Sequence, residues 1–170
     1  MTSQQQHDQF KEWLQQHQAL LFKVVRAYAK TEADRNDLFQ EISLQVWRSV
    51  PNFKGKSAVT TWLYRIALHT AMTWKRNEKK HRVGRQNIED TLYLIPVEQY
   101  EPDERLGWLY AEIALLDKVD RSLALLLLDG YSYQEMAQML GISQSLVGVK
   151  IHRIKQRLLK RAAKKSPYAI

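Results

Sequence analysis

Apolar side chains recur at every third or fourth position through most of the chain, the spacing that places them on one face of a helix. In the first half this pattern predicts a helix over about Asp8 to Tyr28, a second from an N-cap at Asp34 to Pro51, and a third capped by Ser57. The side chains predicted to be buried are Phe10, Trp13, Leu14, Leu21, Val24, Val25 and Tyr28, then Leu38, Phe39, Ile42, Val46 and Trp47, then Val59, Trp62, Leu63, Ile66, Ala67 and Thr70. Glycine is scarce and no stretch alternates as strands do, so the pattern predicts an all-α protein.

The second half of the chain continues this periodicity between glycines and acidic caps. Pro102 and Asp103 are predicted to begin a helix whose apolar face is formed by Leu106, Leu109, Tyr110, Ile113 and Leu116. Asp120 is predicted to cap a further helix, which runs to Leu128 and is closed by Gly130. Its last six residues are apolar almost all round, which is typical of a central helix covered by its neighbours.

The stretch from Tyr131 to Arg161 has the pattern of a helix-turn-helix. Ser132 and Glu135 have the spacing of a capping box that begins a short helix at about Tyr133, and Gly141 can adopt the left-handed conformation that ends it. Ser143 or Gln144 can then cap a longer helix with the buried stripe Val147, Ile151, Ile154 and Leu158. Any two packed helices joined by a glycine turn look similar, so charge has to decide between packing alone and DNA binding.

The charge of the chain favours a polyanionic partner. The formal net charge is +8 and the isoelectric point is about 9.7. From Lys150 onward the longer helix carries eight cations and no acidic residue: Lys150, Arg153, Lys155, Arg157, Lys160, Arg161, Lys164 and Lys165. A solvated helix normally mixes both signs, so charge of one sign indicates phosphate contacts and DNA binding by this segment.

Several classes of protein are disfavoured by what the sequence lacks. The longest apolar run, Leu123 to Leu128, is too short to span a bilayer, and residues 1–8 lack the apolar core of a signal peptide, so we expect a cytoplasmic protein without membrane insertion. The absence of cysteine excludes disulfides and thiolate metal sites, and no histidine pair has the spacing of metal ligands. No glycine-rich phosphate loop and no catalytic set is visible, so no enzyme, metal or cofactor is expected.

Composition changes after Arg85. Residues 86–104 contain no Lys or Arg, two prolines and six acidic residues. We therefore predict two small helical domains, residues 1–85 and 104–170, joined by an acidic flexible linker, residues 86–103. The apolar stretch Leu92 to Ile95 indicates that this linker docks on a partner.

Aromatic and basic residues are interleaved along the third helix. Trp62, Tyr64 and Trp74 alternate with side chains predicted to face outward, which are Thr61, Arg65, Leu68, His69, Met72, Lys75, Arg76, Lys79 and Lys80. Such rings can be core beside solvated charge, which is the better interpretation for Trp62. They can also form a platform that receives bases while cations follow the phosphates of a single strand.

Motifs at both ends of the chain together resemble one family. Asp37 to Glu41 (DLFQE), Trp47 to Phe53 (WRSVPNF) and Thr61 to Ala67 (TWLYRIA) resemble region two of bacterial RNA polymerase sigma factors, in the extracytoplasmic-function group. Tyr131 to Ala137 (YSYQEMA) and Leu140 to Ile142 (LGI) are similar to region four of that group. The motifs occur in the family's order and span about residues 10–161.

The resemblance implies a protein without enzymatic activity that binds core RNA polymerase and promoter DNA and is held inactive by an anti-sigma factor. By position, it implies a polymerase contact at Asp37, Gln40, Glu41 and Leu44, which share an outward face. Melted DNA of the downstream element would meet Phe53, Lys56, Ser57, Thr60, Tyr64, Arg65, His69, Lys75 and Arg76. Duplex DNA of the upstream element would meet Ser132, Gln144, Ser145, Gly148, Val149, Lys150, His152, Arg153 and Lys155.

The chain departs from the family in both DNA-binding segments. His69 and Thr73 stand where members of the family often have Asn and an acidic residue, respectively. In the recognition helix, apolar residues and Gly148 replace part of the polar set that is expected to read the bases. A glycine inside a helix costs about 0.8–1 kcal/mol relative to alanine, so Gly148 either is tolerated at an exposed position or allows close approach to DNA. The alternatives to a sigma factor are a stand-alone helix-turn-helix regulator and a DNA recombinase, for which no nucleophile with an Arg cluster is visible.

Overall fold

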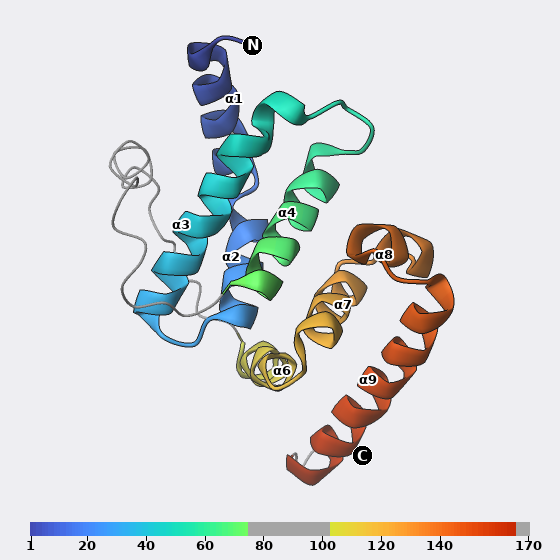
Figure 1. The fold of residues 1–170 in the computed structure, drawn as a ribbon. Coiled ribbons are helices and arrows are strands. Elements are labelled where there is room, and N and C mark those ends of the chain that lie inside the picture. The colour runs from blue at the N-terminus through green and yellow to red at the C-terminus, as the bar shows by residue number, and fades with distance from the viewer. Residues whose placement is uncertain (75–102, 166–170) are drawn as a thin grey trace. The chain divides into compact units, whose positions relative to one another are not determined.

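The chain forms two compact units, Met1–Pro102 and Asp103–Ile170, each built from helices (Figure 1). The structure is a computed structural model that describes residues 1–74 and 103–165. Within those ranges every regular element is a helix, which confirms the predicted all-α class with two small helical domains. Of the predicted linker only its last residue, Asp103, falls within the described part of the chain.

The first unit comprises α1 (Ser3–Gln16), α2 (Gln18–Tyr28), α3 (Glu32–Ser49), the short 3₁₀ helix η1 (Val50–Asn52) and α4 (Val59–Thr73). Helices α2, α3 and α4 pack together, whereas α1 packs on α3 and η1 (Figure 1). The prediction of one helix from Asp8 to Tyr28 is therefore wrong. The helix is interrupted at His17, whose φ of −117° and ψ of 19° depart from helical values, and α1 begins earlier through a capping box at Thr2.

The core of the first unit contains large rings as well as aliphatic side chains. Tyr64 and Phe10 are among the largest fully buried side chains, and Leu68 is 0% exposed. The prediction that Leu68 faces outward is wrong, because α4 is buried on a wide arc by α2 and α3. Trp47 is predicted to be buried but is only half-buried. It lies near the end of α3, which is followed directly by the short helix η1.

Helix starts differ from the prediction in a consistent way. Thr31, not Asp34, caps α3, because its hydroxyl accepts a hydrogen bond from the Asp34 backbone N–H at 3.1 Å. Asp117, not Asp120, caps α7 by the same geometry at 2.9 Å. In both places the expected cap residue occupies the third helical position, where its negative charge is favourable to the helix dipole. At α4 the N-cap is Ala58, without a side-chain hydrogen bond, so the prediction for Ser57 is wrong.

The second unit comprises α6 (Glu104–Ala114), α7 (Lys118–Leu128), α8 (Tyr133–Leu140) and α9 (Gln144–Lys165). Asp103 caps α6 as predicted, and α7 contacts α6, α8 and α9 as a central helix should. Gly130 has a φ of 79°, and the Tyr131 and Gly130 amides donate to the carbonyls of Leu126 and Leu127. This is the Schellman arrangement that ends a helix with a left-handed glycine, so the predicted closure by Gly130 is confirmed.

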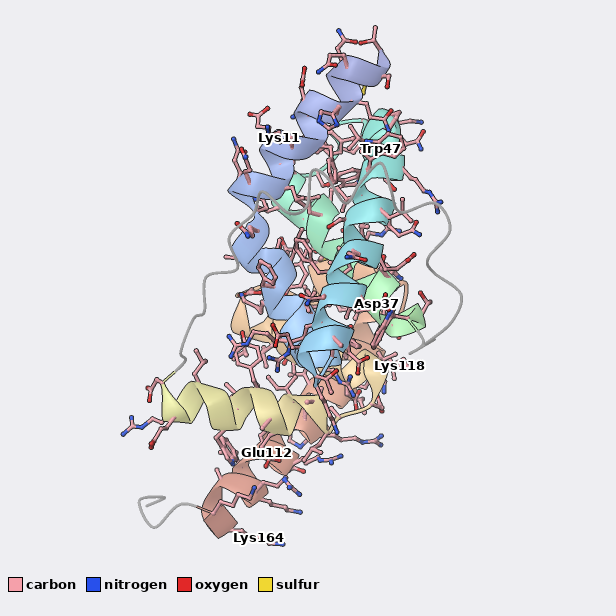
Figure 2. The ribbon with its side chains drawn as sticks, turned by 90° about the vertical axis from the view of Figure 1, so that its left-hand side faces the viewer. Lys11, Asp37, Trp47, Glu112, Lys118 and Lys164 are labelled. Carbon is pink, nitrogen blue, oxygen red and sulfur yellow. The ribbon has the colours of Figure 1, made fainter. Side chains whose placement is uncertain are left out.

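A buried carboxylate links the first helix of the second unit to the end of its last helix. Glu112 on α6 is 3% exposed and forms ion pairs with Arg161 and Lys165 at the end of α9. Figure 2 labels Glu112 on α6 and Lys164 on α9. A buried charge is stable only when it is paired, so these cations hold α9 against α6.

Candidate nucleic-acid interface

One face of α3 carries the residues expected to contact a protein partner. Gln40, Glu41 and Leu44 are half-buried, opposite a buried stripe formed by Leu38, Phe39, Ile42, Ser43 and Val46. Glu41 accepts a hydrogen bond from the Gln45 side chain at 3.0 Å. Leu44 is less exposed than expected, yet it lies on the same face as Glu41 because residues three and four apart are neighbours on a helix.

Asp37 lies on α3 (Figure 2), four residues before Glu41 and so on the same face, and it is also tied to α4. Its carboxylate accepts a hydrogen bond of 3.1 Å from the indole nitrogen of Trp74, the residue that follows the last turn of α4. Asp37 therefore helps fix the end of α4 as well as contributing to the outer face of α3. Sequence periodicity could not have shown this, because the two residues lie 37 positions apart.

The loop before α4 and the outer side of α4 form a polar, accessible surface. Its exposed members from the predicted set are Lys56, Ser57, Thr60, Arg65 and His69. Gly55 in this loop has a φ of 66°, a left-handed conformation that favours glycine. Arg65 and His69 are four residues apart and so project from neighbouring turns of the same side. In this arrangement the guanidinium of Arg65 and the imidazole of His69 can contact a nucleic-acid strand together.

A cluster of three rings supports that loop. Phe53 lies 5.1 Å from Trp13 and 5.0 Å from Trp62 between ring centroids, and Trp13 lies 5.5 Å from Trp62. Edge and tilted ring pairs at this spacing are favourable beyond the area that they bury. Phe53 is half-buried in this cluster, and its contacts with the two indoles fix the start of the loop. The interpretation of Trp62 as core agrees with these contacts.

Tyr64 does not belong to the accessible surface. It is 0% exposed, so no face of its ring is available to a base in this fold. The expectation that Tyr64 handles DNA is corrected for that reason. Lys75 and Arg76 lie outside the described residues.

Helices α8 and α9 form the helix-turn-helix that the sequence predicts. Ser132 and Glu135 make both hydrogen bonds of the capping box, and Gly141 ends α8 with a φ of 69°. The Ser143 hydroxyl accepts from the Leu146 amide at 3.1 Å, which identifies Ser143 as the cap of α9. Val147, Ile151 and Ile154 are buried, and Leu158 is half-buried. The fold of the motif is thereby confirmed.

The outer side of α9 presents most of the residues predicted to meet duplex DNA. Gln144, Ser145, Val149, His152, Arg153 and Lys155 are exposed. Ser132 is exposed too, although its hydroxyl is already engaged by the capping box. Lys150 is half-buried because its ammonium group contacts the Asp120 carboxylate on α7 at 3.0 Å.

This contact forms part of a small charged cluster at the start of α7. The backbone N–H of Asp120 lowers the pKa of Asp117 below its usual value, and the nearby Lys150 ammonium acts in the same direction. One cation of α9 thus stabilises the neighbouring helix. The eight cations of the helix are therefore not all directed at DNA.

Gly148 lies under the ring of Tyr133 from α8. A Cβ atom built at Gly148 would lie 3.8 Å from the nearest ring carbon, which is ordinary van der Waals contact. Gly148 is half-buried, so the interpretation that places it at an exposed position is wrong. The helix-turn-helix itself leaves room for a methyl group there.

Several structural residues were missed by pattern reading. Thr31 and Asp117 have a local signal, because each stands three residues before the aspartate that the sequence pattern predicts as the cap. The burial of Glu112 and the contact between Asp37 and Trp74 have no local signal, since their partners are distant in sequence. Among the described residues no group of three or more His, Asp or Glu side chains could hold a metal ion, and no helix there is long and apolar enough to cross a bilayer.

Comparison with known proteins gives the same organisation. The family model described as Sigma-70 region 2 matches residues 13–81, and that described as Sigma-70, region 4 matches residues 106–158. The ECF RNA polymerase sigma factor SigX of Bacillus subtilis (strain 168) is 32% identical over 142 residues, covering 78% of this chain and 71% of the relative. RNA polymerase sigma factor YlaC of the same organism is 29% identical over 133 residues, covering 75% of this chain and 77% of the relative.

Solved structures share the fold. CnrH in complex with the cytosolic domain of CnrY superposes with a TM-score of 0.62 at 21% identity, covering 92% of this chain and 89% of that one. The sigma factor RpoE in complex with the anti-sigma factor NepR from Bartonella quintana gives a TM-score of 0.60 at 18% identity, covering 92% of this chain and 99% of that one.

The two helical units, one with a basic helix-turn-helix, define a DNA-binding transcription factor. The chain belongs to the sigma-70 family of RNA polymerase sigma factors, in its extracytoplasmic-function group. It is a transcription initiation factor that binds core RNA polymerase and promoter DNA. A stand-alone regulator that binds an operator without polymerase is not favoured.

Proposed function

We propose that this factor binds polymerase and promoter DNA through three separate surfaces. The α3 face containing Gln40, Glu41 and Leu44 binds the polymerase. The loop before α4 and the outer side of α4 bind the melted strand of the downstream element. The exposed side of α9 reads the upstream element as duplex. The observation that supports this assignment is that the side chains on α3, α4 and α9 are exposed or half-buried and lie opposite a buried stripe of the same helix.

The polymerase surface is tested by charge reversal at Glu41. Glu41→Lys should weaken binding to sigma-free core polymerase, since losing one partner of an interfacial charge pair costs about 2–5 kcal/mol. Glu12→Lys, at an exposed position of α1, is the matched control for the change in net charge. Glu41 is preferable to Asp37 because Asp37 also holds Trp74. A pull-down in which both variants retain the polymerase equally would reject the assignment.

The melted-strand surface is tested at Arg65 and His69. Their replacement by alanine should reduce permanganate reactivity of thymines in the open complex while leaving promoter binding by α9 intact. Lys11→Ala, at an exposed cation of α1 (Figure 2), controls for the loss of a positive charge. Footprints of unchanged intensity in both alanine variants would remove α4 from the proposal.

The duplex surface is tested by separating the contacts that position the helix from the contacts that read the base sequence. Lys155→Ala should weaken binding to all promoters alike and reduce the salt slope by about one unit, because phosphate contacts carry no sequence information. Changes at Gln144 or Arg153 should alter which promoters are preferred, since the first turns of a recognition helix reach base edges. Unchanged preference after saturating changes at both positions would show that α9 is docked differently.

The decisive test of the whole function is run-off transcription. Sigma-free core polymerase, supplied with this chain and genomic fragments, should start transcripts at a limited set of positions. We also propose that the protein acts in the cytoplasm, has no catalytic activity of its own, and is held inactive by an anti-sigma factor. Support for the last point comes from the similar structure of the sigma factor RpoE, which is in complex with the anti-sigma factor NepR.

A further inference from the structure

The exposed side of α9 is unexpectedly apolar in its first two turns. Val149 is 48% exposed and Leu146 is 41% exposed, although neither belongs to the buried stripe of Val147 and Ile151. Two positions separate Val149 from Val147, which places the two side chains on opposite sides of the helix. Leu146 lies three residues before Val149, so the two exposed side chains are neighbours.

The cation that follows this apolar pair in the sequence is engaged within the domain. Lys150 contacts Asp120 on α7 at 3.0 Å, so the cation nearest to the pair already has a partner within the domain. Further along α9, Arg153, Lys155 and Arg157 are exposed, and the helix contains no carboxylate. An apolar pair followed by exposed cations complements a polyanion that presents an apolar group, rather than the surface of another protein.

Duplex DNA offers one such group in its major groove. The C5-methyl of thymine is the one apolar substituent on the base edges there, whereas the edges of guanine, cytosine and adenine carry hydrogen-bonding atoms without such a group. Those polar edges would lose water against Val149 without gaining a partner, which is unfavourable. Thymine gains apolar contact instead.

We propose that Val149 and Leu146 select thymines in the upstream promoter element through their C5-methyl groups. This inference rests on the proposed docking of α9 in the major groove. It predicts that at one or two base pairs the preference comes from apolar contact, while Gln144, Ser145 and His152 supply hydrogen bonds to the neighbouring pairs.

The experiment removes the methyl group alone. Core polymerase carrying the full-length factor is used to select bound sequences from a duplex library with a randomised upstream window. The selected duplex is then synthesised with deoxyuridine in place of thymine, one position at a time, and binding of the same holoenzyme is measured. At the position opposite Val149 or Leu146, affinity should fall about fourfold, the factor corresponding to the burial of one methyl-sized group.

Protein variants assign the effect to the side chains. In Val149→Ala the ratio of affinities for thymine and deoxyuridine should approach one at a single position, and Leu146→Ala should act in the same way at that or an adjacent pair. Alanine is the better helix former, so neither variant should unfold α9. Leu159→Ala is the matched control, because Leu159 is 70% exposed on the same helix but three turns further along.

The outcomes separate this inference from the function on which it rests. A holoenzyme that starts transcription at its promoters but binds every deoxyuridine duplex as tightly as the thymine duplex overturns the inference and leaves the function standing. Selected sequences without thymine in the upstream window also overturn it. Failure of run-off transcription on all genomic fragments rejects the proposed function itself.

Discussion

The two units of this sigma factor stabilise their helices and their candidate binding surfaces by different means. In the first unit large aromatic rings provide this stabilisation. Tyr64 and Phe10 are fully buried, and the cluster of Trp13, Phe53 and Trp62 supports the loop before α4. In the described part of the second unit the buried hydrophobic side chains are aliphatic or methionine. There, ion pairs and caps hold the helices, through Glu112 and the Asp120–Lys150 contact.

The difference shows that net charge is a poor measure of DNA-binding capacity. Lys150, Arg161 and Lys165 all belong to the basic helix α9, yet each contacts an acidic residue of its own domain. The primary role of these cations is to stabilise the folded domain. In the first unit, conversely, aromatic residues that resemble base-stacking groups in the sequence are largely structural, as the burial of Tyr64 demonstrates.

The largest expected effect is the loss of ring packing in the first unit. Tyr64→Ala should destabilise that unit by about 3–5 kcal/mol, the usual cost of removing a buried aromatic side chain. Hydrogen exchange of the full chain should show lost protection in α2, α3 and α4 while α7 to α9 keep theirs. Leu159→Ala should leave both units protected, because it removes an exposed side chain. Equal loss of protection in both units after Tyr64→Ala would contradict the separate cores described here.

The next effect concerns the ion pairs of the second unit. Glu112→Gln should destabilise it by about 1–3 kcal/mol, because a charge-assisted hydrogen bond to Arg161 is replaced by a weaker one. The same change releases Arg161 and Lys165, so binding to non-specific duplex should strengthen and its salt slope should steepen. Glu104→Gln, at an exposed position of the same helix, is the control for net charge. If Glu104→Gln steepens the slope equally, the pairing of Glu112 is not what restrains these cations.

A smaller effect is expected at the cap of α7. Asp117→Ala should cost about 1 kcal/mol at neutral pH, the usual loss for an N-cap. Because the pKa of Asp117 is lowered in the folded state, its stabilisation is present above its unfolded pKa and is lost as the pH falls through the lower folded pKa. The melting temperatures of wild type and variant should therefore converge below about pH 4. A difference that stays constant down to pH 2.5 would show that the carboxylate charge contributes nothing.

The smallest expected effect is a gain. Gly148→Ala should stabilise α9 by about 0.5–1 kcal/mol, since the new methyl meets Tyr133 at an ordinary distance. Thermal unfolding measures the gain, and transcription from the selected promoter decides its meaning. Lower transcription despite higher stability indicates that the backbone at Gly148 approaches DNA closely. Unchanged transcription indicates that the glycine is merely tolerated.

Sequence periodicity predicted helices well wherever local signals were unambiguous. The capping box at Ser132, the left-handed glycines at 130 and 141, and the stripe Val147, Ile151 and Ile154 were all recovered, because each depends on neighbours within a few residues. Cap positions failed where two acceptable residues stood three apart, as with Thr31 and Asp34. The earlier residue prevails because it adds helical hydrogen bonds and leaves the later one at a favourable position.

Side-chain environment was harder to predict than helix position. Tyr64 and Leu68 share a helix with exposed Arg65 and His69, and only the packing of α2 and α3 against α4 decides which side is covered. The partners of Glu112 and Asp37 are separated from them by 49 and 37 positions, respectively. Contacts of this kind depend on the assembled fold and leave no periodic trace.

The ring cluster beneath the loop before α4 also gives the protein an optical reporter of its own. Indole emission changes with the surroundings of the ring, and Trp13 and Trp62 both contact Phe53, where the loop begins. A strand that displaced Lys56 or Ser57 would shift Phe53 and thereby alter the environment of two indoles at once. Capture of the melted strand should consequently be visible in stopped-flow fluorescence, without an attached dye.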